Sequence, residues 1–191
     1  MAHYPKILQT GGSGGTSGTS GTNGASGTSG TSGTTSVINY RTITDGTAIT
    51  GTVASTETSS ILIPANTVAV GDIINVRVRL KKTGTAGTVI LRFYVNTTAV
   101  IGGSLVGTST TASTVTRYIQ MTRVLAVKSA TGTETFQAGG QGTTDDVVFT
   151  ATVATPNIDW TVTQHFVAAI QNGSAADSSL SSFIHIQINK A

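Results

Sequence analysis

Polar and apolar residues alternate most regularly in residues 72–81. One set of alternate positions is apolar and the other is polar or basic: Ile74, Val76, Val78 and Leu80 against Asn75, Arg77, Arg79 and Lys81. Successive side chains of a strand point to opposite faces, so this period of two predicts a half-buried β-strand. Turn residues follow at 82–87, and 88–95 is again rich in β-branched and aromatic residues, which predicts a hairpin.

Short segments of the same kind continue to the C-terminus, with Gly, Asn, Asp or Pro in most of the gaps. We expect strands at 48–53, 60–63, 104–108, 115–127, 133–137, 147–153, 158–162, 165–171 and 182–189. No segment shows the 3.6-residue period of an amphipathic helix. The pattern therefore predicts an all-β fold, a sandwich of two sheets with the jelly roll as the leading topology.

Glycine follows a different rule before residue 37. It occupies every third position, at Gly12, Gly15, Gly18, Gly21, Gly24, Gly27, Gly30 and Gly33. A collagen triple helix requires this spacing because only glycine fits at its crowded axis, and residues 12–35 would form a rod on the order of 70 Å long. The triplets contain no proline, so we expect this stalk to need a trimeric C-terminal domain that holds its strands together. A flexible glycine/serine linker is the alternative.

The residues ahead of the triplets include several large apolar or aromatic side chains: Tyr4, Pro5, Ile7 and Leu8. Such a peptide can add a strand or fill a pocket on a capsid or tail protein, so residues 1–11 are expected to be an anchor. Three copies in one fibre would add avidity. The alternative is an unstructured tail. The predicted organisation is thus an anchor at 1–11, a stalk at 12–36 and a β-sandwich head at 37–191.

Composition excludes several classes of function. Without cysteine, the chain has no disulfide, zinc–thiolate site or thiol nucleophile. The formal net charge of +3 comes from scattered basic residues, which does not favour nucleic-acid binding. The first ten residues lack the apolar core of a signal peptide, and no apolar run is long enough to cross a bilayer. We therefore expect neither a nucleic-acid partner nor a membrane partner.

The ionisable residues suggest no enzyme. His3, His165 and His185 have no second ligand at a metal-site spacing, and we expect His185 at a surface or an interface. Asp145 and Asp146 follow a loop sequence and are expected to be solvated rather than to coordinate calcium. No G-x-S-x-G motif is present. The sequence therefore predicts no catalytic residue, no metal ligand and no cofactor.

The densest group of basic residues is Arg77, Arg79, Lys81 and Lys82. We interpret it as the charged outer face of a strand, which also discourages edge pairing. A site for an acidic glycan or for the capsid surface is the alternative, carried by Arg77, Arg79 and Lys81. Trp160, the only tryptophan, is expected to pack at the edge of the core.

The chain resembles bacteriophage fibre and head-decoration proteins, which join a short anchor, a collagen-like stalk and a trimeric C-terminal β-sandwich of jelly-roll or tumour-necrosis-factor-like type. The glycine triplets carry the resemblance in the stalk. In the head it rests on 63–67, the strand and turn through 74–87, and the segments 91–97, 158–161 and 176–179. The resemblance implies no catalytic residues.

The expected function is therefore that of a structural, homotrimeric fibre on a phage capsid. It would be made in the host cytoplasm, assembled onto the virion surface, and would carry a head for adhesion to the host, including its surface glycans. A tail-fibre receptor-binding protein and a bacterial spore-surface protein with a collagen-like stalk are alternatives. A glycan-degrading enzyme is disfavoured, since the chain has only eight acidic residues and such enzymes need a pair of carboxylates facing each other.

Overall fold

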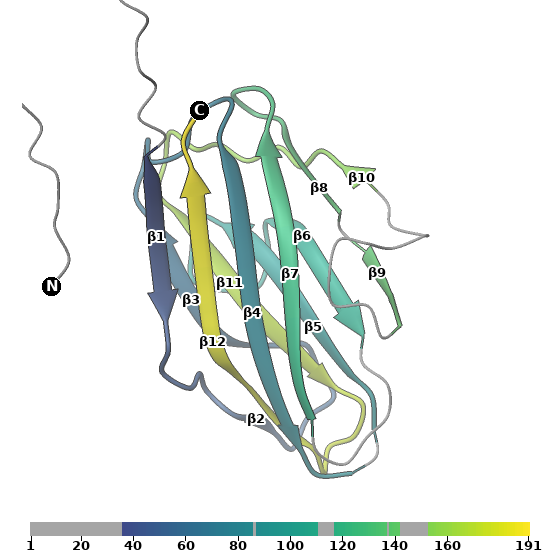
Figure 1. The fold of residues 1–191 in the computed structure, drawn as a ribbon. Coiled ribbons are helices and arrows are strands. Elements are labelled where there is room, and N and C mark those ends of the chain that lie inside the picture. The colour runs from purple at the N-terminus through teal and green to yellow at the C-terminus, as the bar shows by residue number, and fades with distance from the viewer. Residues whose placement is uncertain (1–35, 86, 111–116, 137, 142–152) are drawn as a thin grey trace, which may run out of the picture. The chain divides into compact units, whose positions relative to one another are not determined.

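The computed structural model describes residues 36–85, 87–110, 117–136, 138–141 and 153–191. These residues form a sandwich of two β-sheets packed face to face (Figure 1). The prediction of an all-β, two-sheet sandwich is confirmed. Within the described ranges there is no helix, and hence none that could span a membrane.

The first sheet, called sheet A, has the strand order β1-β12-β4-β7-β8-β10, and β2 pairs with β12 beside this path. Its strands are all antiparallel to their neighbours. They are β1 (Val37–Thr42), β2 (Ile49–Thr50), β4 (Ile73–Thr83), β7 (Arg117–Val127), β8 (Thr133–Phe136), β10 (Val153–Ala154) and β12 (Ser178–Asn189).

The second sheet, called sheet B, has the strand order β3-β11-β5-β6-β9. It is antiparallel except for the short β9, which runs parallel to β6. Its strands are β3 (Thr56–Ile63), β5 (Val89–Asn96), β6 (Ser104–Thr110), β9 (Ala138–Gln141) and β11 (Gln164–Asn172). In both sheets, strands that are neighbours in space are mostly distant in the sequence, so the chain crosses repeatedly from one sheet to the other (Figure 1).

The alternation in β4 explains why this strand lies where it does. Ile74, Val76, Val78 and Leu80 are at most 1% exposed and face sheet B, whereas Arg77 and Arg79 point to solvent. On the opposite sheet, Phe166 packs against Phe93 and Trp160 at ring-centre distances of 5.7 Å and 6.2 Å. The core thus forms between the alternating apolar residues of β4 and an aromatic group made by two residues of sheet B and Trp160.

The predicted strand at 158–162 is wrong, because these residues form a turn. The carboxylate of Asp159 accepts hydrogen bonds from the backbone N–H of Thr161 at 2.9 Å and from its hydroxyl at 2.6 Å. This local bonding holds a turn instead of a ladder. Trp160 is 5% exposed and donates to the hydroxyl of Thr133 at 3.0 Å, so its predicted place at the edge of the core is confirmed.

Strand β1 was not predicted, and the strand expected at 48–53 is reduced to Ile49–Thr50. The apolar residues of β1 are only partly covered, because β1 forms the edge of sheet A and pairs with β12 alone. Most of the strand expected at 147–153 lies outside the described residues.

The first and last residues of the sandwich lie at the same end (Figure 1). The backbone N–H of Lys190 donates to the carbonyl of Ser36 at 3.0 Å. Close by, the buried carboxylate of Asp72 accepts from the Lys190 ammonium at 2.5 Å and from the backbone N–H of Ala191 at 3.1 Å. The chain therefore enters and leaves the sandwich at one end.

Candidate functional site

The outward side of sheet A gathers most of the exposed basic side chains of the sandwich, and Figure 1 looks onto this side. The strand register brings together residues that are distant in the sequence: Arg41 of β1 is the partner of His185 of β12, which is in turn the partner of Arg77 of β4. We call this surface the basic face. It consists of Arg41, Arg77, Arg79, Lys81, Tyr118, Phe183 and His185.

The predicted stripe of Arg77, Arg79 and Lys81 lies on this face, with Arg77 and Arg79 exposed and Lys81 half-buried. Alternate residues of a strand are about 7 Å apart, so the three cationic side chains project from the sheet in a row about 13 Å long. The structure thus places these residues on one surface, as the alternation predicts.

Aromatic side chains lie among the charges. The guanidinium of Arg79 is 5.9 Å from the centre of the Phe183 ring, within the range of a cation–π contact. The Phe183 ring is in turn 6.1 Å from the imidazole of His185, whose Nε2 is 3.0 Å from the side-chain oxygen of Asn39. Tyr118 is 64% exposed beside Lys81, its partner in the register. These contacts hold part of the face in a defined arrangement.

Sequence reasoning missed Arg41, Tyr118 and Phe183, which belong to three other strands. The alternation in β1, with Asn39 and Arg41 on one side and Ile38 and Tyr40 on the other, was the signal that could have revealed its contribution. The prediction that His185 lies at a surface is confirmed, because this side chain points away from the buried Ile184 and Ile186.

The prediction that Lys82 lies on the charged outer face of the strand is wrong, because its side chain points into the sandwich and is 1% exposed. The same alternation that sends Lys81 outward sends Lys82 inward. Its ammonium lies 3.1 Å from the carboxylate of Asp177 and donates to the carbonyl of Thr85 at 2.6 Å. Lys82 therefore belongs to the interior and not to the basic face.

The Lys82–Asp177 ion pair connects the β4–β5 loop to the β11–β12 loop, at the end of the sandwich opposite Ser36. Asp177 is fully buried and also accepts from the backbone N–H and the hydroxyl of Thr85 at 2.7 Å and 2.8 Å. Two glycines of the β4–β5 loop leave room for Asp177, because a Cβ on Gly84 or on Gly87 would lie 2.8 Å from atoms of Asp177. The two loops are thus built around one buried carboxylate.

Both buried carboxylates ionise more readily than a free aspartate. Burial raises the pKa of Asp177, but hydrogen bonds from Thr85 and Lys82 and the charge of Lys82 outweigh it and hold the pKa below its ordinary value of 3.8. Burial opposes ionisation of Asp72 in the same way, and Lys190 with two backbone N–H groups lowers its pKa below 3.8. Both groups therefore stabilise the fold in the charged form.

Stability is expected to fall in acid for this reason. A carboxylate with a lowered native pKa contributes stability that is complete well above its unfolded pKa and is lost as the pH falls through the native pKa. We expect the free energy of unfolding to be steady from neutral pH to about 5 and to decrease below about 4. Urea titrations at stepwise lower pH measure this. A stability that rises on acidification would contradict the assigned ion pairs.

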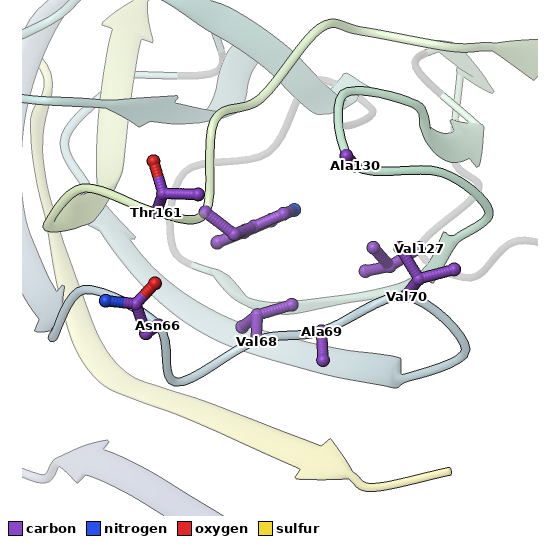
Figure 2. Close-up of a pocket in the computed structure, with 8 residues that line it drawn as sticks. Asn66, Val68, Ala69, Val70, Val127, Ala130 and Thr161 are labelled. Carbon is purple, nitrogen blue, oxygen red and sulfur yellow. The ribbon is translucent and has the colours of Figure 1, made fainter.

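A small apolar pocket lies at the end of the sandwich where the chain enters, and its volume is about 170 Å³. Figure 2 shows Asn66, Val68, Ala69 and Val70 of the β3–β4 connection along one side of it. Its other lining residues are Val127, Ala130, Trp160 and Thr161. None of these side chains ionises, so the pocket offers apolar contacts and no acid, base or charged group.

The remaining candidates are separate from these surfaces. His165 lies on sheet B and His185 on sheet A, so the sandwich separates them. In the described part of the chain, no three His, Cys, Asp or Glu side chains are placed to hold a metal ion. The predicted anchor residues Tyr4, Pro5, Ile7 and Leu8, the eight glycines of the triplet register, and Asp145 and Asp146 lie outside the described residues. The sequence matches no protein-family model, and a search of the curated proteins gives no match.

Proposed function

We propose that the protein is a structural, homotrimeric virion fibre without catalytic activity. In this account residues 1–11 anchor it to a bacteriophage capsid, residues 12–36 form a collagen-like stalk, and the sandwich is a jelly-roll head that adheres to the host surface. The observation that carries the proposal is the strict spacing of glycine at every third residue ahead of a β-sandwich. A flexible linker needs glycine content, whereas only a close-packed axis needs glycine in phase.

The strand order supports a jelly-roll head. β11 lies between β3 and β5 in sheet B, and β4 lies between β12 and β7 in sheet A. Antiparallel strands interleaved in this way, with the chain alternating between two sheets, are the pattern of paired Greek keys. The shared end for Ser36 and Lys190 also suits a fibre head, because a stalk entering there leaves the loops of the opposite end free to reach a host.

A substitution in the triplets tests the stalk. Gly24→Val puts a side chain where the triple helix has no room, so we expect the low-temperature melting transition of the stalk to shift down by several degrees or to disappear. The transition of the sandwich should not move. Circular dichroism of the full chain during heating resolves the two.

Gly14→Val is the matched control, because Gly14 lies between the register positions Gly12 and Gly15. It should leave both transitions in place. Equal behaviour of the two variants would favour a flexible linker over a triple helix.

The place of the fibre is tested by labelling the C-terminus on intact particles and imaging them. The proposal requires the label on the capsid, at the end of a projection. A label at the tail tip would support the alternative of a tail-fibre receptor-binding protein, and label on a spore coat would support the spore-surface alternative.

A further inference from the structure

The basic face carries charges of one sign. Arg41, Arg77, Arg79 and Lys81 form no ion pair with any described residue. Among the described carboxylates, only Glu134 of β8 lies on the outward side of sheet A, and it is paired with Lys128. Asp72 and Asp177 are buried in ion pairs, Glu57 is on sheet B, and Asp45 and Asp159 are outside the strands. The seven residues of the basic face thus offer cations and no carboxylate, and the one described carboxylate on this side of the sheet is already paired with a lysine.

The arrangement of these cations suits a linear partner. Arg77, Arg79 and Lys81 are spaced evenly along β4, and Arg41 and His185 extend the array sideways across β12 to the edge strand β1. A guanidinium presents parallel donors that match a carboxylate or sulfate group in a bidentate geometry. Several evenly spaced cations on a flat sheet can therefore engage successive anionic groups of an extended chain.

The aromatic side chains favour a carbohydrate among the possible polyanions. Phe183 lies under the Arg79 guanidinium, and Tyr118 projects beside Lys81 with more than half of its surface exposed. The apolar face of an exposed aromatic ring can pack against the C–H groups of a sugar, while neighbouring cations bind the anionic groups of the same sugar. Apolar contact and charge thus occur side by side on this face.

We propose that the basic face binds an anionic polysaccharide, a linear sugar polymer with regularly spaced carboxylate or sulfate groups. This deepens the proposed adhesive role and rests on it only for the statement that the polymer belongs to a host surface. A nucleic acid fits less well, because four basic side chains neutralise few phosphates, and neutralisation of phosphates supplies most of the sequence-independent affinity for a duplex. A second copy that packed against this face through its own basic face would place like charges against each other, which is unfavourable.

Binding of polygalacturonate to the full chain tests the proposal, with neutral dextran and a DNA duplex as comparison ligands. The double variant Arg77→Gln/Arg79→Gln is expected to raise the half-saturating polygalacturonate concentration at least about ten-fold, since it removes two charge-assisted contacts. Gln120→Glu, which puts a carboxylate beside Arg79, should weaken binding in the same direction. Dextran should not bind.

The control Arg92→Gln/Lys128→Gln removes the same charge from positions outside the basic face, because Arg92 lies on sheet B and Lys128 lies beyond the end of β7, where it pairs with Glu134. It should change the half-saturating concentration by less than about two-fold, since long-range attraction between exposed groups is screened by salt. Each variant is compared with the parent chain by thermal melting, and Gln120→Glu provides the second reading if the arginine variant unfolds.

Three results would overturn the proposal. Equal weakening by both double variants would mean that net charge alone attracts the polymer. Tighter binding of the DNA duplex than of polygalacturonate at equal ionic strength would indicate a nucleic-acid surface. A change of molecular mass in Arg77→Gln/Arg79→Gln would mean that a second copy covers the face. A chain that fails to bind the polymer can still be a trimeric fibre, and a chain that proves to be monomeric can still bind the polymer. The two proposals can therefore fail separately.

Discussion

Asp177→Ala is expected to lower the free energy of unfolding by about 3–5 kcal/mol, because it removes the carboxylate that faces the buried ammonium of Lys82. Both side chains are at most 1% exposed, so water cannot replace the lost partner without opening the two loops. The same substitution removes the acceptor for two hydrogen bonds from Thr85. Urea unfolding of the full chain, followed by circular dichroism at one fixed protein concentration, measures the effect.

Glu134→Ala is the control, since it breaks the Lys128–Glu134 ion pair, whose side chains are 60% and 38% exposed. Exposed pairs contribute little, and we expect a loss below about 1 kcal/mol. If the two variants lose the same amount, the Lys82–Asp177 pair is not a buried element of the fold and the account of this end of the sandwich is wrong.

Phe166→Ala is expected to destabilise the sandwich by a similar amount, about 3–5 kcal/mol. The Phe166 ring is fully buried and lies between Phe93 and Trp160, so truncation leaves a cavity that the rigid sheets cannot fill. Leu62→Ala on the neighbouring strand β3 is the matched control, because its side chain is 49% exposed.

The Leu62 variant should change the free energy of unfolding by roughly 0.5 kcal/mol or less, as is usual for surface positions. Urea unfolding curves of both variants decide the comparison. A loss for Phe166→Ala no larger than that for Leu62→Ala would mean that the two sheets are not packed around this aromatic group.

Periodicity predicted the class of the fold and the central strands, and the physical reason is visible in β4. Along β4, successive residues face sheet B and solvent in regular alternation, so the local sequence pattern predicts which side chains are buried. The pattern fails where burial is decided by other segments. Five successive residues of β11, from Phe166 to Ile170, are buried, and β1 lies at an edge with little cover.

The turn at 158–162 shows a second limit, because a side chain there decides the backbone conformation. Residues 158–162 alternate apolar and polar, and this suggested a strand, but Asp159 bonds to Thr161 and ends the extended chain. Lys82 shows a third limit. Its charge suggested solvent, yet its place in the alternation sent it inward, and only the fold brings Asp177 close to it.

The candidate site could be predicted only in part for the same reason. The sequence showed the three basic residues of one strand, since Arg77, Arg79 and Lys81 are two positions apart. It could not show that Arg41 and Phe183 lie beside them, because the pairing of β12 with β1 and β4 joins segments that are far apart in the sequence. Surfaces built from several strands of a sandwich follow from topology, which local patterns do not encode.

The mass of the full chain in solution tests the central claim most directly, because the proposed triple-helical stalk, the proposed trimeric head and the proposed avidity of the anchor all require three copies. Light scattering at a temperature below the melting of the stalk should give three times the chain mass of 19.3 kDa. The mass should remain at this value when the protein is diluted through the range used for the binding and unfolding measurements. A mass equal to that of one chain would contradict both the triple helix and the trimeric head.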